Sequence, residues 1–248
     1  MPNINLYDGI TNLPNGIGTP SGLGLAYGQI PQPGPLPSPP FPPGSTAAVA
    51  AGAFTPNTTG INTDTIYTGD SNVGYAGYIN YDAQSLLTPT PAILPPFTAT
   101  ALDRTAGYTI SFNAAIPAET SNANSAGFSV TAISSDGLNG LELGFKKNGI
   151  IFGQLETFIQ GETIVFFNPA VPNNYVLKVQ GSNYELFIND LPTPVLSGPL
   201  RQFQFDPAAS SPPLPFNPYR LPNFLSFTDN TDQGSATFRL GKIAVNDL

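Results

Sequence analysis

The 248-residue sequence contains no histidine, no cysteine and no tryptophan. Without histidine and cysteine the chain cannot form a Ser-His-Asp or Cys-His catalytic arrangement, an imidazole or thiolate metal site, or a disulfide bond. Without tryptophan it also lacks the indole platform that is common in sugar clefts. These absences remove most nucleophilic catalysis and transition-metal chemistry. Paired carboxylates and calcium, which prefers oxygen ligands, are the chemistries that remain.

Charge is also scarce. Charged residues make up 10% of the chain, the net charge is −8, and Arg104 is the first basic residue. Nucleic-acid binding and attraction to anionic lipid both need clustered basic residues. We therefore expect no nucleic-acid partner. No apolar run reaches the roughly 18 residues of a membrane-spanning helix, so we expect no membrane span either.

The remaining composition is rich in Thr, Asn, Gly and Pro, which is typical of β-rich extracellular or surface domains. The N-terminal residues lack the charged and apolar regions of a signal peptide. We expect an extracellular or cell-surface protein whose signal peptide was removed before Met1. A cytosolic location is the alternative.

Apolar and polar residues alternate with a period of two, which predicts half-buried antiparallel strands. The inward-facing residues are predicted to be Tyr108/Ile110/Phe112, Phe128/Val130/Ala132, Leu141/Leu143/Phe145, Tyr175/Leu177/Val179, Tyr184/Leu186/Ile188 and Phe238/Leu240. Asn148-Gly149 predicts a two-residue hairpin turn, and residues 181–183 predict a three-residue one. No window keeps a helical apolar stripe. The predicted fold is an all-β antiparallel sandwich.

Eight prolines fall within residues 31–43 (PQPGPLPSPPFPP). This composition favours a polyproline II conformation, because each proline ring fixes φ and removes a hydrogen-bond donor. The segment could be a ligand for an aromatic groove, or simply a stiff loop or arm.

Residues 175–198 (YVLKVQGSNYELFINDLPTPVLSG) resemble the hairpin of laminin G-like and concanavalin A-like jelly rolls, and residues 236–245 (ATFRLGKIAV) resemble their closing strand. Short segments along the whole chain, among them LAYG at 25–28, AGFSV at 126–130, LELGF at 141–145 and GPLR at 198–201, are similar to bacterial exported proteins of the choice-of-anchor type, frequent in cyanobacteria. The resemblance implies one jelly-roll domain over residues 1–248, with 31–43 as a loop inside it. It implies no catalytic residues. The chain departs from that pattern in its many prolines and in ending at Leu248 without an anchoring segment.

Glycan binding could use the rings of Tyr75, Tyr78 and Tyr81 for stacking, with Asn80 and Asp82 as hydrogen-bonding groups. The alternative is that these Tyr and Gly residues simply build a strand and its bends.

Calcium is the candidate cofactor, and Asp229 and Asp232 are its candidate ligands, because side-chain oxygens alternate along residues 229–232. Turn formation by Asp and Asn explains the same pattern. Asp103-Arg104 could form a buried ion pair with a structural role.

Paired-carboxylate hydrolysis needs two carboxyl groups on one face of a cleft. Glu142 has Gly144 at the position where a partner on the same face would lie, and Glu156 and Glu162 lie near an expected loop. We interpret all three as solvated surface residues and expect no enzyme.

Three functions follow. The first is a non-catalytic extracellular jelly roll that binds glycan or matrix. The second is a structural subunit of a sheath, matrix or filament that assembles with copies of itself. A glycoside hydrolase or polysaccharide lyase is the weakest of the three.

Overall fold

The computed structural model describes residues 4–7, 25–30, 46–51, 63–68, 75–82, 85–88, 90–97, 100–165, 168–209, 214–229 and 235–248. Along Ala26–Ile30, Thr46–Ala51 and Thr63–Thr68 it describes the backbone alone. The proline-rich segment 31–43 lies outside the described residues. The prediction of one domain over residues 1–248 therefore stays a prediction.

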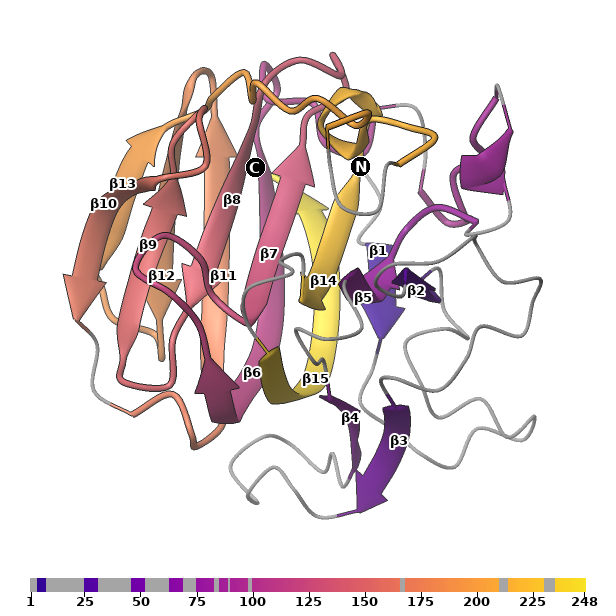
Figure 1. Ribbon diagram of the computed structural model, residues 1–248. Helices are drawn as coiled ribbons and strands as arrows, with labels where there is room; N and C mark the ends of the chain where they lie inside the picture. Colours follow the sequence, from indigo (N-terminus) through magenta and orange to yellow (C-terminus); the bar gives the residue numbers. More distant parts are fainter. Residues whose placement is uncertain are drawn as a thin grey trace.

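Two antiparallel sheets stack face to face (Figure 1). The back sheet has the order β13 (Leu196–Pro199), β12 (Asn183–Ile188), β11 (Asn173–Gln180), β6 (Tyr108–Thr120), β15 (Ser235–Asp247), β4 (Thr63–Thr68) and β3 (Thr46–Ala51), and β1 (Ile4–Tyr7) also pairs with β15. The front sheet has the order β10 (Gln160–Val165), β9 (Ile150–Gln154), β8 (Gly140–Phe145), β7 (Phe128–Ile133), β14 (Leu225–Asp229), β5 (Tyr75–Ile79) and β2 (Ala26–Ile30). The prediction of an all-β antiparallel sandwich is confirmed.

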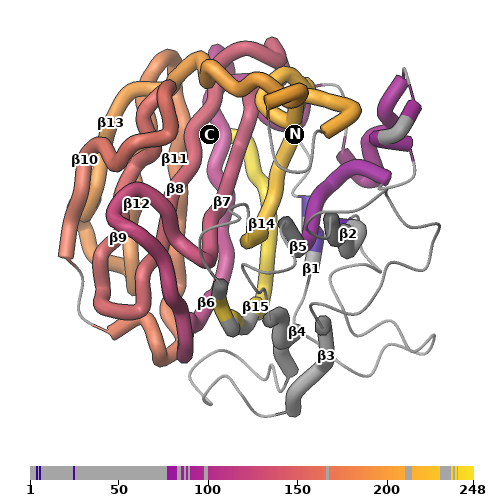
Figure 2. Tube along the Cα trace, viewed as in Figure 1, coloured from indigo at the N-terminus to yellow at the C-terminus, as the bar shows by residue number. Residues whose placement is uncertain are grey.

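The two longest strands, β6 and β15, run side by side in the back sheet (Figure 2). On its other side β15 pairs with β4 near its start and with β1 near its end. The helical segments described are the three-residue 3-10 turns η2 (Ser85–Leu87) and η3 (Pro218–Arg220). None of the described residues forms a helix that is long and apolar enough to cross a membrane.

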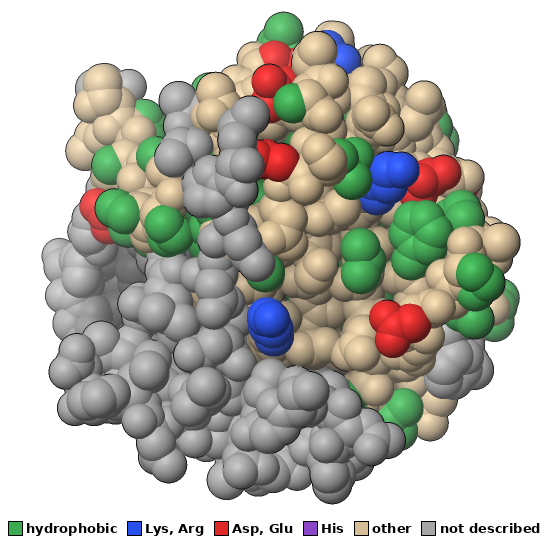
Figure 3. Space-filling model, turned by 180° about the vertical axis from the view of Figure 1, so that it is seen from behind, with side chains coloured by type: hydrophobic (Ala, Val, Ile, Leu, Met, Phe, Trp, Pro, Cys, Tyr) green, Lys and Arg blue, Asp and Glu red, His purple; other side chains and the backbone are tan. Residues whose placement is uncertain are grey.

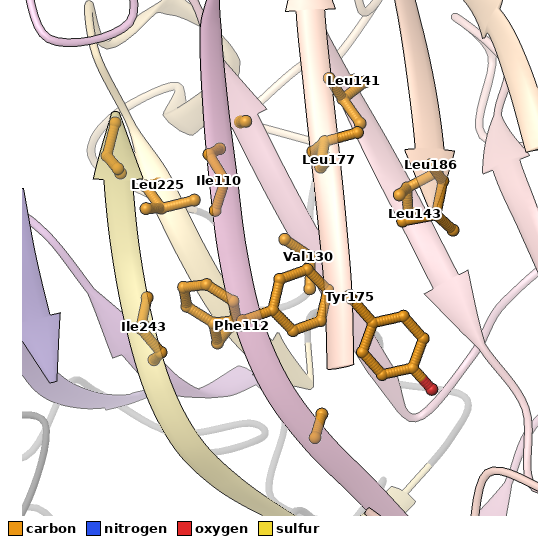
Figure 4. Packing of buried hydrophobic residues seen from close by; sticks show 14 of the residues in the cluster. Ile110, Phe112, Val130, Leu141, Leu143, Tyr175, Leu177, Leu186, Leu225 and Ile243 are labelled. Atoms are coloured by element: carbon orange, nitrogen blue, oxygen red, sulfur yellow. The ribbon is translucent and has the colours of Figure 1, made fainter. Parts of the chain in front are cut away.

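The core lies between the sheets, and every inward-facing residue predicted from the alternation is buried in it. At its centre the rings of Phe112 and Tyr175 stack with centroids 4.9 Å apart, and Phe227 meets Phe112 edge to face at 5.4 Å (Figure 4). Full burial of each such side chain stabilises the fold by about 1.5–3 kcal/mol. The alternating pattern therefore identified the core correctly.

The turns differ in detail from the prediction. β8 and β9 do form a hairpin, but its loop spans residues 146–149, and of these only Gly149 has positive φ, at 89°. β11 and β12 are joined by the two residues Gly181 and Ser182, because Gln180 already pairs with Asn183. The hairpins were correctly predicted, whereas their loop lengths were wrong.

The surface of the back sheet carries few charges (Figure 3). Here Lys178 and Glu185 form an ion pair of 3.8 Å, with both side chains more than a third exposed. Next to them a chain of amides crosses the sheet, since Asn113 donates to Asn174 and the Asn189 carboxamide accepts from the Asn174 backbone. These contacts are typical of a low-charge, solvated face.

Candidate ligand-binding face of the front sheet

Four hydroxyl side chains lie together on the outer face of the front sheet. Ser129 and Thr131 point outward from β7, and Ser226 and Thr228 point outward from β14, because their neighbours in each strand face the core. The register places Ser226 opposite Thr131 and Thr228 opposite Ser129. We call these four residues the hydroxyl patch.

The hydroxyl patch is shielded from solvent, with exposed fractions between 2% and 8%. None of its four hydroxyl oxygens is among the fully enclosed, unpartnered side-chain atoms of the described residues. The patch is therefore a row of small polar side chains that the fold leaves only narrowly accessible.

Glu142 extends the patch along the sheet, since β8 places it opposite Thr131. It is only 6% exposed, and the Tyr219 hydroxyl donates a hydrogen bond of 2.5 Å to its Oε2 atom. The interpretation of Glu142 as a solvated surface residue is therefore wrong. The loop between β13 and β14, which carries Tyr219, folds back over this side of the front sheet and buries the carboxylate.

Tyr219 belongs to a group of rings at the end of the sandwich. We call this group the aromatic end cluster; it consists of Phe158, Phe203, Phe205, Phe216 and Tyr219. The Phe158 ring stacks on Phe203 with centroids 5.5 Å apart, and Phe203 lies 4.7 Å from Tyr219. Phe158, Phe205 and Phe216 are half-buried, so part of each of these side chains faces solvent.

Phe158 reaches this position through an unusual backbone conformation. Its φ is 61°, a left-handed value that costs a non-glycine residue about 1–3 kcal/mol. The turn is closed by hydrogen bonds from Leu155 N to Ile159 O and from Phe158 N to Leu155 O. The ring contacts with Phe203 and Tyr219 help to offset this strain.

Glu162 lies on the opposite face of the front sheet and joins it to the back sheet. Arg201 Nη1 donates to Glu162 Oε1 at 3.0 Å, Arg201 Nη2 contacts Oε2, and the Tyr184 hydroxyl also donates to Oε1. Gly153 and Gly198 leave room for the carboxylate, with which a Cβ atom at either position would collide. We call this arrangement the edge brace, and it shows that the solvated interpretation of Glu162 is also wrong.

The pKa values in the edge brace follow from its contacts. Burial alone would raise the pKa of Glu162, but the hydrogen bonds from Arg201 and Tyr184 outweigh burial and hold this pKa below its usual value. Burial raises the pKa of Tyr184, and the hydrogen bond to Glu162 raises it further. Glu162 is therefore a fixed carboxylate within an ion pair.

The carboxylates considered for hydrolysis do not converge. Glu142 points out of the front sheet, whereas Glu162 points into the sandwich, so these two carboxyl groups cannot flank one glycosidic bond. Glu156 is exposed in the turn between β9 and β10, as expected.

The predicted stacking tyrosines are mostly enclosed. Tyr78 is completely buried in the main core, and Tyr81 is 4% exposed, with its hydroxyl group hydrogen-bonded to the Pro222 carbonyl. The side chain of Tyr75 lies outside the described residues. A sugar could therefore stack on neither Tyr78 nor Tyr81 in this conformation. The region forms β5 and its bends, with Gly77 at a φ of 151°.

The predicted polar partners have structural contacts. Asn80 is completely buried; its side chain donates to the Asn223 carbonyl at 2.7 Å and accepts from the Leu225 amide at 2.8 Å. Asp82 is half-buried, and its Oδ2 atom accepts from the Ser85 amide. Asn80 is therefore not available to a ligand in this conformation. Glycan binding by Tyr75, Tyr78, Asn80, Tyr81 and Asp82 together stays a prediction.

Of the two predicted calcium ligands the structure describes one. Asp229 is completely buried at the end of β14, and Asp232 lies outside the described residues, so the calcium site stays a prediction. Among the described residues no group of three or more carboxylates could hold a metal ion.

The expected Asp103–Arg104 ion pair is wrong. Arg104 Nε instead pairs with Asp136 at 2.8 Å, and Arg104 Nη1 donates to the Gly181 carbonyl. Asp103 accepts a hydrogen bond from the Thr105 amide. Adjacent side chains of opposite charge were paired in the prediction, whereas the fold supplies a partner 32 residues away.

No protein-family model matches the sequence, and no curated protein is significantly similar to it. Among solved structures, the chain is similar to that of the "conserved carbohydrate esterase vb_24B_21 from Shiga toxin-encoding bacteriophage phi24B", with 13% sequence identity, 99% coverage of each chain and a TM-score of 0.58.

Two weaker similarities are to sheep galectin-11 and to a beta-1,3-glucanase from Mycobacterium marinum. The galectin has 15% identity over 57% of this chain and 91% of that chain, with a TM-score of 0.33. The glucanase has 11% identity over 74% of each chain, with a TM-score of 0.36. The phage protein shows the shared fold, and the TM-scores of the other two are too low to support an inference.

Proposed function

We propose that this chain is a non-catalytic, extracellular or cell-surface protein that binds a glycan or matrix polymer at the outer face of the front sheet. The supporting observation is the hydroxyl patch, a row of outward-pointing Ser and Thr side chains that continues into the Glu142 carboxylate. A sugar presents hydroxyl groups, which match these hydrogen-bonding groups. Because the patch residues are 2–8% exposed, the ligand reaches them through local opening of this face.

Export and the absence of catalysis belong to the same proposal. Export is supported by the low charge of the chain and by the similarity of its short segments to exported choice-of-anchor proteins. The absence of histidine removes the usual general base, and Glu142 and Glu162 face opposite ways.

The binding experiment is a glycan array followed by calorimetry on the full chain, with calcium and with a chelator. The double variant Thr131→Val/Ser226→Ala removes two hydroxyl groups of the patch with little change in shape. We expect its affinity for the bound glycan to fall about tenfold or more. Ser111→Ala, a half-buried serine on the outer face of the back sheet, is the matched control and should bind normally.

An array without binding in either buffer would refute the glycan proposal, and equal binding by both variants would refute the assigned face. Release of acetate from acetylated sugars, or cleavage of a glycan, would refute the non-catalytic part.

A second candidate function is a structural subunit that assembles with copies of itself. It is favoured by a separate observation, the exposed apolar side chains of Leu138 and Ile159 at the end of the sandwich.

A further inference from the structure

One end of the sandwich exposes apolar side chains that its own described residues do not cover. Leu138, in the loop before β8, is 48% exposed, and Ile159, in the turn after β9, is 47% exposed. The half-buried rings Phe158, Phe205 and Phe216 lie at the same end, beside η3. We call this surface the end patch. Exposed apolar surface that is contiguous rather than scattered usually marks an interaction site.

The backbone conformation of Phe158 also indicates an interaction site at the end patch. A glycine would adopt a φ of 61° without strain, yet the chain places a large aromatic residue there and leaves its ring half-buried. Strained residues that the surrounding structure maintains are concentrated at functional sites. Two exposed amides, Gln202 and Gln204, flank Phe203 and can donate hydrogen bonds to a ligand backbone.

These features match the chemistry of a polyproline II segment. Such segments dock on clustered aromatic rings and offer free backbone carbonyls to nearby donors, and they lose little entropy because proline holds them extended. The chain contains one such sequence, residues 31–43, with Pro37 and Pro40 spaced three apart, as are Pro39 and Pro42. The segment carries no charge, so it avoids repulsion between copies with a net charge of −8.

The segment could dock within its own molecule or on another molecule. Its two attachment points, at the end of β2 and the start of β3, distinguish these possibilities. Ile30 pairs with Tyr75, at the end of β5 away from η3, and Thr46 pairs with Thr68, near the Thr120 end of β6. Ile30 therefore lies at the end of β5 away from the end patch, and Thr46 lies at the end of the sandwich opposite the end patch, where Figure 1 draws β3 and β4.

The length of the connection excludes docking within one molecule. Residues 31–45 give fifteen residues between β2 and β3, or about 46 Å when extended as polyproline II. A strand of six residues, such as β7, already spans about 20 Å, so travelling to the end patch and back would use almost the whole connection. About two residues would remain, too few to lie across the rings.

We propose that residues 31–43 of one molecule dock on the end patch of a second copy of this chain. The contact joins opposite ends of the sandwich, so it is head-to-tail, and unless it closes into a ring it continues as an open filament. This proposal does not depend on glycan binding by the front sheet.

The test uses two variants of the full chain and sedimentation velocity. Phe158→Gly/Ile159→Ser damages the end patch while it relieves the positive φ, and Pro37→Ala/Pro40→Ala/Pro42→Ala damages the segment. We expect the wild-type chain to form a concentration-dependent series of oligomers, and each variant alone to associate at least about tenfold more weakly. An equimolar mixture should form dimers and nothing larger, because it contains only one intact segment and one intact patch per pair.

Val165→Ser is the matched control, since Val165 is an exposed hydrophobic residue, at 76%, that lies outside the end patch. It should assemble like the wild-type chain, and a synthetic peptide of residues 31–43 should inhibit assembly. A wild-type chain that stays monomeric up to about 1 mM refutes the proposal, as does a mixture that forms no dimers. Competition by a glycan instead of the peptide would assign the rings to the glycan and also refute it. A glycan array without binding leaves the oligomer series unaffected, so the two proposals fail separately.

Discussion

The guanidinium group of Arg201 makes a two-point contact with the carboxylate of Glu162, and this contact joins the two sheets where their edge strands β10 and β13 meet. Edge strands are open to pairing with other chains, and an inward-pointing charge on such a strand opposes that pairing. Pro199, at the end of β13, has the same effect on the neighbouring edge. The brace therefore closes this side of the sandwich and disfavours edge-to-edge assembly there, which is consistent with an end-to-end contact.

Removing one partner of the edge brace should be strongly destabilising. Arg201→Ala leaves the Glu162 carboxylate, with a side chain only 22% exposed, without its counter-ion, and we expect a loss of about 3 kcal/mol or more in the free energy of unfolding. Lys178→Ala breaks the exposed pair with Glu185 and should cost about 0–1 kcal/mol. Urea denaturation of both variants checks this. Equal losses would mean that the brace contributes no more than a surface ion pair.

The edge brace should also make stability depend on acid. The pKa of Glu162 is lower in the folded chain than in the unfolded chain. Its contribution is therefore complete above the unfolded value of about 4.3 and is lost as the pH falls through the folded value. The Tm of Glu162→Gln/Arg201→Met should fall less than the wild-type Tm between about pH 5 and pH 2. Thermal melts followed by circular dichroism measure this difference, and parallel Tm curves would contradict it.

Gly77 allows β5 to approach β14 closely. Its φ is 151°, and an added Cβ atom would lie 2.6 Å from Thr228 Cα. Gly77→Ala should therefore destabilise the chain by about 3 kcal/mol or more, from backbone strain and overpacking together. At Gly181 the φ is 62° but the space is open, so Gly181→Ala should cost only about 1–2 kcal/mol. If denaturation finds the two losses equal, the close approach at Gly77 is not the cause.

The alternating pattern predicted the core because it is a local property of each strand. Successive side chains of a strand point to opposite faces. In β6 this turns Tyr108, Ile110 and Phe112 inward, and it turns Thr109 and Ser111 outward. The pattern could not reveal which outward-facing residues the rest of the chain covers. Glu142 faces outward as the alternation requires, yet a loop 77 residues away buries it.

Side-chain partners were missed for a related reason. Arg201 and Glu162 lie 39 residues apart, so their contact depends on how the two sheets close on each other. The tyrosines near β5 predicted a glycan site because aromatic rings often stack on sugars, but Tyr78 lies in a strand and its ring fills the core. The Ser and Thr residues that alternate with core residues in β7 and β14 were the available signal for the hydroxyl patch. Only the pairing of these two strands brings them together.

The hydrogen bond between Tyr219 and Glu142 provides a test that separates packing from electrostatics. Tyr219→Phe keeps the ring in the aromatic end cluster but removes the hydroxyl donor from a carboxylate that is 6% exposed. We expect the free energy of unfolding to fall by about 1–3 kcal/mol, because the buried group loses a partner. Glu142→Gln keeps an acceptor oxygen for Tyr219 and avoids a buried charge, so its effect should be smaller.

Ligand binding adds a second readout to this pair. If the outer face of the front sheet binds a glycan, both variants should change its affinity, because both alter the polar end of the hydroxyl patch. Tyr81→Phe is the matched control, since it removes a comparable buried hydrogen bond, to the Pro222 carbonyl, away from the patch. It should lower stability and leave affinity unchanged. Unfolding curves and calorimetric titrations on the same preparations measure both effects. If Tyr81→Phe loses as much affinity as Tyr219→Phe, the loss of affinity comes from general loosening of the fold and not from the hydroxyl patch.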